Sequence, residues 1–185
     1  MMAVWLLILI IIAVLFIIVF SIYNSLIRSR NNVENAWSQI DVQLKKRYDL
    51  VPNLIETVKG YMKHERETLS EITQLRSQAM NATDRDLKMK ADSKMAKAVS
   101  GILNIAVESY PDLKASQNFL QLQEELSGIE NKIAYSRQYY NDSIMVYNNK
   151  TQMFPTNVFA KMFNFPEKKF LETAETEKKN VKVAF

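Results

Sequence analysis

The chain has no cysteine, and it has only three glycines, four prolines and one histidine among its 185 residues. Without cysteine there is no disulfide, no thiolate metal site and no cysteine nucleophile. A catalytic triad or a multi-histidine metal site would have to be built around the single imidazole of His64. The scarcity of glycine and proline, beside abundant Ala, Leu, Lys, Glu and Gln, favours helices over turn-rich β or βαβ classes. The sequence therefore predicts an all-α protein.

The residues that could carry chemistry do not form a known catalytic or metal-binding pattern. His64 and Glu65 begin like the zinc motif H-E-x-x-H, but "HERE" lacks its second histidine. A di-metal carboxylate site would have to draw on Glu108, Glu124, Glu125 and Glu130. Bundles that build such sites use Glu-x-x-His motifs, and no histidine accompanies these glutamates. There is no glycine-rich phosphate loop and no nucleophile elbow. We expect no enzymatic activity, no metal and no cofactor.

Charge also argues against one class of partner. The formal net charge is only +4, and the one compact basic cluster, Lys45 to Arg47, is followed at once by Tyr48 and Asp49. A nucleic-acid-binding face would need a broader basic surface with stacking aromatic residues. We expect no nucleic-acid partner.

The first 22 residues contain no charged side chain and read "MMAVWLLILIIIAVLFIIVFSI". About 20 apolar helical residues, at about 1.5 Å each, cross a hydrocarbon core of about 30 Å, so residues 1–23 are predicted to be a transmembrane anchor. A cleavable signal peptide is the alternative, but a basic n-region and an A-x-A site are missing. Basic residues follow the span and none precedes it. The positive-inside rule then places the N-terminus outside and the rest of the chain in the cytoplasm.

Beyond the span, apolar residues recur at helical spacing in four segments. The first segment, from Val33 to Val51, follows the span without a breaker, so the two can form one helix. The second reaches Ala79, and the third runs from Leu87 to Ile105. The fourth, from about Leu113 to about Lys150, carries a heptad seam. Its members are Phe119, Leu122, Leu126, Ile129, Ile133, Tyr140, Ile144 and Tyr147. We predict an antiparallel four-helix bundle over residues 24–153.

Pro52 lies where the apolar phase passes almost unbroken from the first segment into the second. A proline inside a helix removes a hydrogen bond, clashes with the carbonyl of Tyr48 and costs about 3 kcal/mol, whereas in a first turn it costs little. A continuous helix from Asn24 to Ala79 would also extend roughly 84 Å, more than a monomer can cover. We therefore predict a corner at Pro52, with a kinked continuous helix as the alternative.

The C-terminal segment, residues 154–185, changes character after "FP". A short aromatic helix is predicted around Phe159 and Phe163. Phenylalanines at helical spacing are more often core, so we expect a cap on the bundle; the alternative is a membrane-surface foot, because lysines interleave with these rings. The final "NVKVAF" alternates as a strand does, and is expected to be an extended tail.

The fourth segment also holds candidate interaction residues. Glu130 and Arg137 lie on one helix face, and Asn131 flanks the apolar seam. Such groups either form a buried network that fixes helix register or are plain exterior residues. Tyr140 and Tyr147 face the same way, as amphipathic residues at the core edge whose hydroxyls reach solvent. We assign these residues structural or interaction roles.

Several stretches resemble the LemA family of bacterial membrane proteins. They are "NNVENAWSQIDVQLKKRYDLVPNLIETVKGY", "YPDLKASQNFLQLQEELSGIENKIAYSRQYYND", "MFPTNVFAKMFNF" and the final "VKVAF". The resemblance covers nearly the whole chain from about Tyr23 to Phe185, and it implies a helical bundle behind a single anchor in the bacterial inner membrane. It implies no reaction, because no catalytic residue set is established for the family. Relatives are associated with a membrane metalloprotease through genomic pairing and, in some bacteria, with magnetosome formation; both are contexts rather than mechanisms, and the protease is a partner by family context only.

The functional expectation is a non-enzymatic, membrane-anchored scaffold or adaptor of the bacterial cell envelope. The heptad seam, the aromatic patch and the extended tail each offer surface to a second copy, so a homo-oligomer is expected. The alternative is a membrane-surface module that senses or shapes the bilayer through its Phe-rich C-terminal segment.

Overall fold

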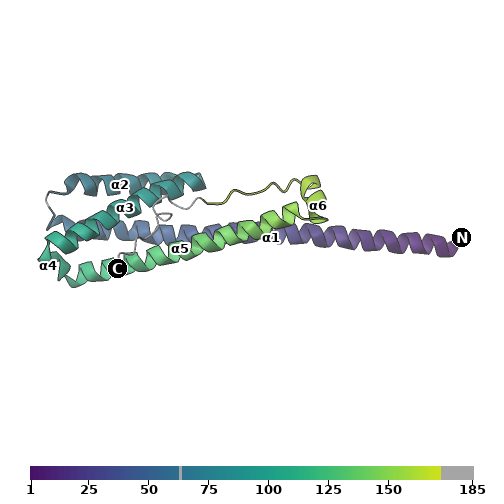
Figure 1. Ribbon diagram of the computed structural model, residues 1–185, viewed down its shortest axis with the longest axis horizontal. Coiled ribbons are helices and arrows are strands. Elements are labelled where there is room, and N and C mark those ends of the chain that lie inside the picture. Colours follow the sequence, from purple (N-terminus) through teal and green to yellow (C-terminus); the bar gives the residue numbers. More distant parts are fainter. Residues whose placement is uncertain (63, 172–185) are drawn as a thin grey trace, which may run out of the picture. The chain divides into compact units, whose positions relative to one another are not determined.

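A computed structural model describes residues 1–62 and 64–171 (Figure 1). Over these residues the chain forms helices and no strand, which confirms the all-α class. The expected extended tail "NVKVAF" lies outside the described residues. The finer expectation, an antiparallel four-helix bundle over residues 24–153, stays a prediction.

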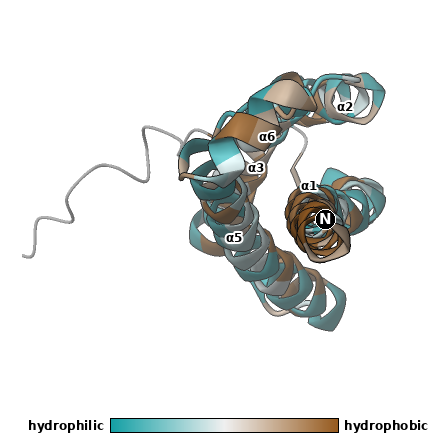
Figure 2. Ribbon diagram, turned by 90° about the vertical axis from the view of Figure 1, so that its right-hand side faces the viewer, coloured by the Kyte–Doolittle hydropathy of each residue, from teal (hydrophilic) through white to brown (hydrophobic). Residues whose placement is uncertain are grey.

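Helix α1, Met2–Lys59, contains both the apolar span and the first predicted segment in one uninterrupted helix. Its N-terminal residues are hydrophobic all round, as Figure 2 shows, and they make α1 a helix long and apolar enough to cross a membrane by length and composition. This agrees with the predicted anchor. Residues that are apolar on every side have no partner face in the described chain and are suited to lipid.

The corner predicted at Pro52 is wrong, because Pro52 lies inside α1 and the helix continues to Lys59. The chain turns instead at Gly60 and Tyr61. The physical reason is tertiary. Proline leaves the carbonyl four residues earlier without its helical donor, and here the Tyr48 carbonyl accepts a hydrogen bond of 2.6 Å from Nε of Arg76. That bond offsets part of the cost that favoured a corner.

The remaining helices are α2 (Arg66–Asn81), α3 (Arg85–Ser109), α4 (Pro111–Lys114), α5 (Gln117–Gln152) and α6 (Thr156–Met162). Asp84 caps α3, since its side chain accepts a hydrogen bond from the Leu87 amide. Helix α3 ends at Ser109, and Pro111 opens α4 at a position where its missing N–H costs little. The single helix expected from Leu113 to Lys150 is divided into α4 and α5 by a break at Ala115 and Ser116.

The chain forms two compact units, each of which draws on α1 and α5. The first unit contains Met1–Gln39 and Ser136–Phe170; the second contains Ile40–Tyr135 and, of the described C-terminal residues, Leu171. Within the second unit α2 and α3 lie side by side (Figure 1).

The apolar stripes are buried inside the chain. In α5 seven of the eight seam positions predicted from the heptad pattern are buried: Phe119, Leu126, Ile129, Ile133, Tyr140, Ile144 and Tyr147. On α3 the buried face is Asp92, Met95, Val99, Ile102 and Ala106. Leu87 and Ile105, the two ends of the predicted third segment, are exposed. The α5 seam therefore packs against the chain's own residues and is not left free for a second copy.

Candidate functional sites

A buried arginine lies at the centre of the second unit. The side chain of Arg47 on α1 is only 4% exposed; its Nη1 donates to Oδ2 of Asp92 on α3 at 2.7 Å, and the Asp92 side chain is also 4% exposed. Its Nη2 donates to Oε2 of Glu130 on α5, whose side chain is 56% exposed. One guanidinium thus joins three helices. Two charges removed from water are tolerated only when they are paired and hydrogen-bonded.

The residue after Arg47 completes this group. Tyr48 is buried, and its carbonyl accepts the hydrogen bond from Arg76 of α2. Burial, followed by the charge of Asp92, raises the pKa of the Tyr48 phenol above its usual range, although Arg47 opposes the shift. The phenol therefore stays protonated at neutral pH. We call Arg47, Tyr48, Arg76, Asp92 and Glu130 the polar centre.

A further ion pair links two of the same helices. Nζ of Lys88 on α3 donates to Oδ1 of Asp41 on α1 at 2.6 Å, in a partly buried setting. The polar centre and this pair together join α1 to α2, α3 and α5. Among residues 1–62 and 64–171, no three or more His, Asp or Glu side chains are grouped as metal ligands. The arrangement is suited to holding helices in register, since its charged groups neutralise one another.

The first unit holds an aromatic group at the end of the span. Tyr23 directly follows the apolar stretch, and its ring lies edge-to-face against Phe163 at 5.1 Å and against Phe165 at 5.9 Å. The guanidinium of Arg30 lies over the Phe165 ring at 5.3 Å. Such ring pairs and cation–π contacts stabilise beyond area burial alone. We call Tyr23, Arg30, Phe163 and Phe165 the aromatic junction; it attaches the end of α6 to α1.

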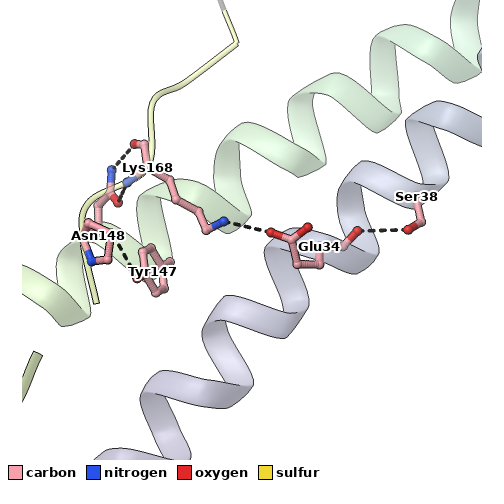
Figure 3. Close-up of polar contacts among 6 residues, drawn as sticks. Glu34, Ser38, Tyr147, Asn148 and Lys168 are labelled. Carbon is pink, nitrogen blue, oxygen red and sulfur yellow. Dashed lines mark hydrogen bonds and ion pairs between the residues drawn. The ribbon is translucent and has the colours of Figure 1, made fainter. Parts of the chain in front are cut away.

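After α6 the chain runs without helix from Phe165 to Phe170, a stretch that we call the strap. Figure 3 shows how Asn148 on α5 binds it: the amide Nδ2 donates to the Lys168 carbonyl, and Oδ1 accepts from the Lys168 N–H, both at 2.9 Å. Nζ of Lys168 reaches Oε1 of Glu34 on α1 at 2.8 Å. One asparagine side chain thus makes the pair of hydrogen bonds that a neighbouring strand would make.

Tyr147 corrects one expectation. Its hydroxyl does not reach solvent; it donates to the Pro166 carbonyl of the strap at 2.9 Å, and the residue is buried. Burial raises the pKa of this phenol, so it remains a donor at neutral pH. Tyr140 is also buried, with its ring edge-to-face to Trp37 at 5.7 Å. The repeated Tyr-Asn pair on α5 therefore includes one member, Tyr147-Asn148, that binds the strap.

The other candidates from the sequence are placed as follows. Asn131 is exposed and Arg137 is half-buried on α5. Phe159 is half-buried on α6, whereas Phe163 stays exposed beside Tyr23. The aromatic helix is neither wholly a cap nor wholly a foot, because Ala160 is buried while Val158 and Met162 are exposed.

Sequence reasoning considered Arg47 only as part of the basic cluster and did not single out Arg76 or Asp92. Two of these three residues, Arg47 and Asp92, nevertheless carry a readable signal. Arg47 shares the helical phase of the buried residues Leu44 and Val51. Asp92 shares the phase of Met95 and Val99. Opposite charges at core positions of two helices indicate a buried pair. Arg76 carries no such signal, since only the fold brings it to the Tyr48 carbonyl.

Comparisons with known proteins agree with the resemblance. The model of the LemA family matches residues 36–185. The chain is 34% identical over 163 residues to Protein LemA of Metamycoplasma hominis, an alignment that covers 85% of this chain and 72% of that protein. The range matched by the family model includes the polar centre and the strap, and it begins after Tyr23.

Proposed function

The chain belongs to the LemA family, and we propose on that premise that it is a non-enzymatic scaffold or adaptor anchored in the bacterial inner membrane. The observation that carries the proposal is α1, a single helix that contains the apolar span and continues to Lys59 within the packed helices. A protein built in this way holds a helical surface at the membrane. The paired charges of the polar centre, which join α1 to α3 and α5, support a structural role for these helices.

The orientation is part of this proposal. Basic residues follow the span, so the N-terminus lies outside and the helices lie in the cytoplasm. A single cysteine introduced by Thr83→Cys, at an exposed position between α2 and α3, tests it because the chain has no other thiol. An impermeant thiol reagent is expected to label this residue only after cell lysis. Labelling of intact cells would reverse the assignment.

Self-association is the second part. The α5 seam is buried within the chain, so a second copy must use other apolar surface, such as the span. We expect the full chain in detergent to have a protein mass of at least twice the 21.5 kDa of one chain. Light scattering coupled to gel filtration measures this mass. A monomer at all protein concentrations would remove self-association from the proposal.

An adaptor also needs a different protein as a partner, and the family context favours a membrane protein such as a protease. A photo-crosslinking residue in place of the exposed Tyr139 on α5 is expected to capture a membrane protein in cells. The matched control carries the crosslinking residue in place of Tyr147, which lies on the same helix but is buried and should therefore not reach a partner. Capture of only this chain from both positions would argue against an adaptor.

A membrane-surface module is the second candidate function, and one contact favours it. Phe163, at the end of α6, lies against Tyr23, the residue at which the apolar span ends. This contact supports a role of the Phe-rich segment at the membrane surface, because it holds the end of α6 beside the end of the apolar span.

A further inference from the structure

The exposed side of α6 is apolar. Phe154 is 83% exposed, Met153 63%, Met162 62% and Val158 53%. Within the described part of the chain, these four large side chains remain largely uncovered. Val158 and Met162 are four residues apart and so share one face of α6, while Ala160 is buried. The helix thus has one side packed on the protein and an outward side on which Val158 and Met162 lie beside the exposed Lys161.

The aromatic junction locates this face. Tyr23 follows the last residue of the span, and tyrosine is enriched at the boundary between hydrocarbon and water. Its ring contacts Phe163, which directly follows Met162 at the end of α6. Figure 2 looks along α1 from its N-terminal end and shows α6 beside it. The C-terminal end of α6 is therefore held beside the residue at which the apolar stretch of α1 ends.

The charges near this face suit a lipid surface. Arg28 follows the span, Lys161 lies on α6 and Lys169 lies on the strap, and all three are exposed. Anionic headgroups attract basic residues placed within a Debye length of the surface. Apolar side chains flanked by basic ones are typical of short segments that lie in the membrane interface.

We propose that α6, with Met153 and Phe154, docks on the bilayer leaflet from which α1 emerges, and that Arg28, Lys161 and Lys169 bind anionic phospholipid headgroups there. The inference rests on the second candidate function and names its partner; it requires no scaffold activity. A lipid surface is favoured over a second copy because the anchor already holds α6 beside it. That tethering removes most of the entropy cost of the encounter.

The test uses the full chain with one cysteine, introduced by Met162→Cys and labelled with an environment-sensitive fluorophore. The protein is placed in nanodiscs that hold one copy each. Quenchers on the lipid acyl chains are expected to quench the probe, and aqueous iodide is expected to quench it weakly. The matched control is Leu87→Cys on α3, which is similarly exposed at 61% and is expected to show the opposite pattern. Equal iodide quenching at the two positions would overturn the proposal.

Two further measurements distinguish lipid from a second copy of the chain as the partner of α6. With the probe at position 162, Val158→Glu is expected to shift the docking equilibrium towards water by about tenfold or more, the effect of removing one apolar side chain from lipid. Leu87→Glu is expected to leave it unchanged. Val158 is exposed, so its substitution does not disturb the core, and helical circular dichroism verifies this. If the probe is protected from iodide only in discs that hold two copies, the apolar face of α6 binds a second copy, and the proposal is overturned.

The binding of anionic headgroups is tested separately, by changing the lipid. Discs that contain an anionic phospholipid are expected to quench the probe more strongly than discs of zwitterionic lipid, and Lys161→Gln with Lys169→Gln is expected to reduce that difference. Identical quenching in the two lipids would overturn the assigned role of the three basic residues. Because each disc holds one copy and no partner, failure of the scaffold proposal would not change any of these readings.

Discussion

Arg47→Met is expected to lower the free energy of unfolding by about 3–5 kcal/mol, because it removes the charged donor that lies 2.7 Å from the buried carboxylate of Asp92. A buried charge that loses its counter-ion retains its full desolvation cost. Removing Glu130, whose side chain is more than half exposed, should cost much less, since water can replace it.

Chemical denaturation of the full chain in detergent, followed by circular dichroism, measures this loss. Lys45→Met is the matched control, because Lys45 is an exposed basic residue on the same helix. The double variant Arg47→Met with Asp92→Leu is expected to recover most of the stability, since an apolar replacement of a buried pair is often neutral. A loss below about 1 kcal/mol for Arg47→Met would indicate a solvated surface pair.

Pro52→Ala is expected to raise the free energy of unfolding by about 1–3 kcal/mol. Proline costs about 3 kcal/mol inside a helix, and the alanine N–H can bond the Tyr48 carbonyl. Part of the gain is offset because that carbonyl already has Arg76 as a donor. A corner at Pro52 would give a different result, since alanine brings little benefit to the first turn of a helix.

The pairing of Pro52 with Arg76 predicts a coupling between them. Arg76→Met is expected to cost about 1–3 kcal/mol beside proline, because it leaves a buried carbonyl without a donor. In the Pro52→Ala background the helix supplies that donor, so the hydrogen-bond part of the loss should vanish. A double-mutant cycle measures the difference, and packing losses common to both backgrounds cancel. Asn53→Ala, at an exposed position of the same helix, is the control. Additive effects would show that Arg76 does not compensate for the proline.

The failure at Pro52 shows where sequence reasoning ended. The local cost of proline and the length of the implied helix both favoured a corner. The donor that offsets part of this cost lies 28 residues further along the chain from Tyr48, on a different helix. The residues around Pro52 do not indicate that this donor exists. The buried face of α3 was predicted only in part: Met95 and Ile102 are buried, but the face also includes the charged Asp92, which a pattern of apolar residues alone does not reveal.

The Phe-rich segment illustrates a different limit. Its short helix was predictable from the spacing of its aromatic residues, yet a cap and a membrane foot remained alternatives. Neither alternative can be chosen from periodicity, because both use the same residues. The contact of Phe163 with Tyr23 decides which end of the packed helices α6 occupies, and the burial of Ala160 decides which of its sides is left outward.

By itself the sequence determined the helical class and the apolar span of α1, because hydropathy and backbone preferences act over a few neighbouring residues. Only the tertiary structure decided that α1 passes through Pro52, that Arg47 pairs with Asp92 and Glu130, and that α6 lies beside Tyr23. Each of these depends on a partner far away in the chain. Such a partner can offset the cost of a proline inside a helix or of a buried charge, and the residues next to that position in the sequence do not reveal it.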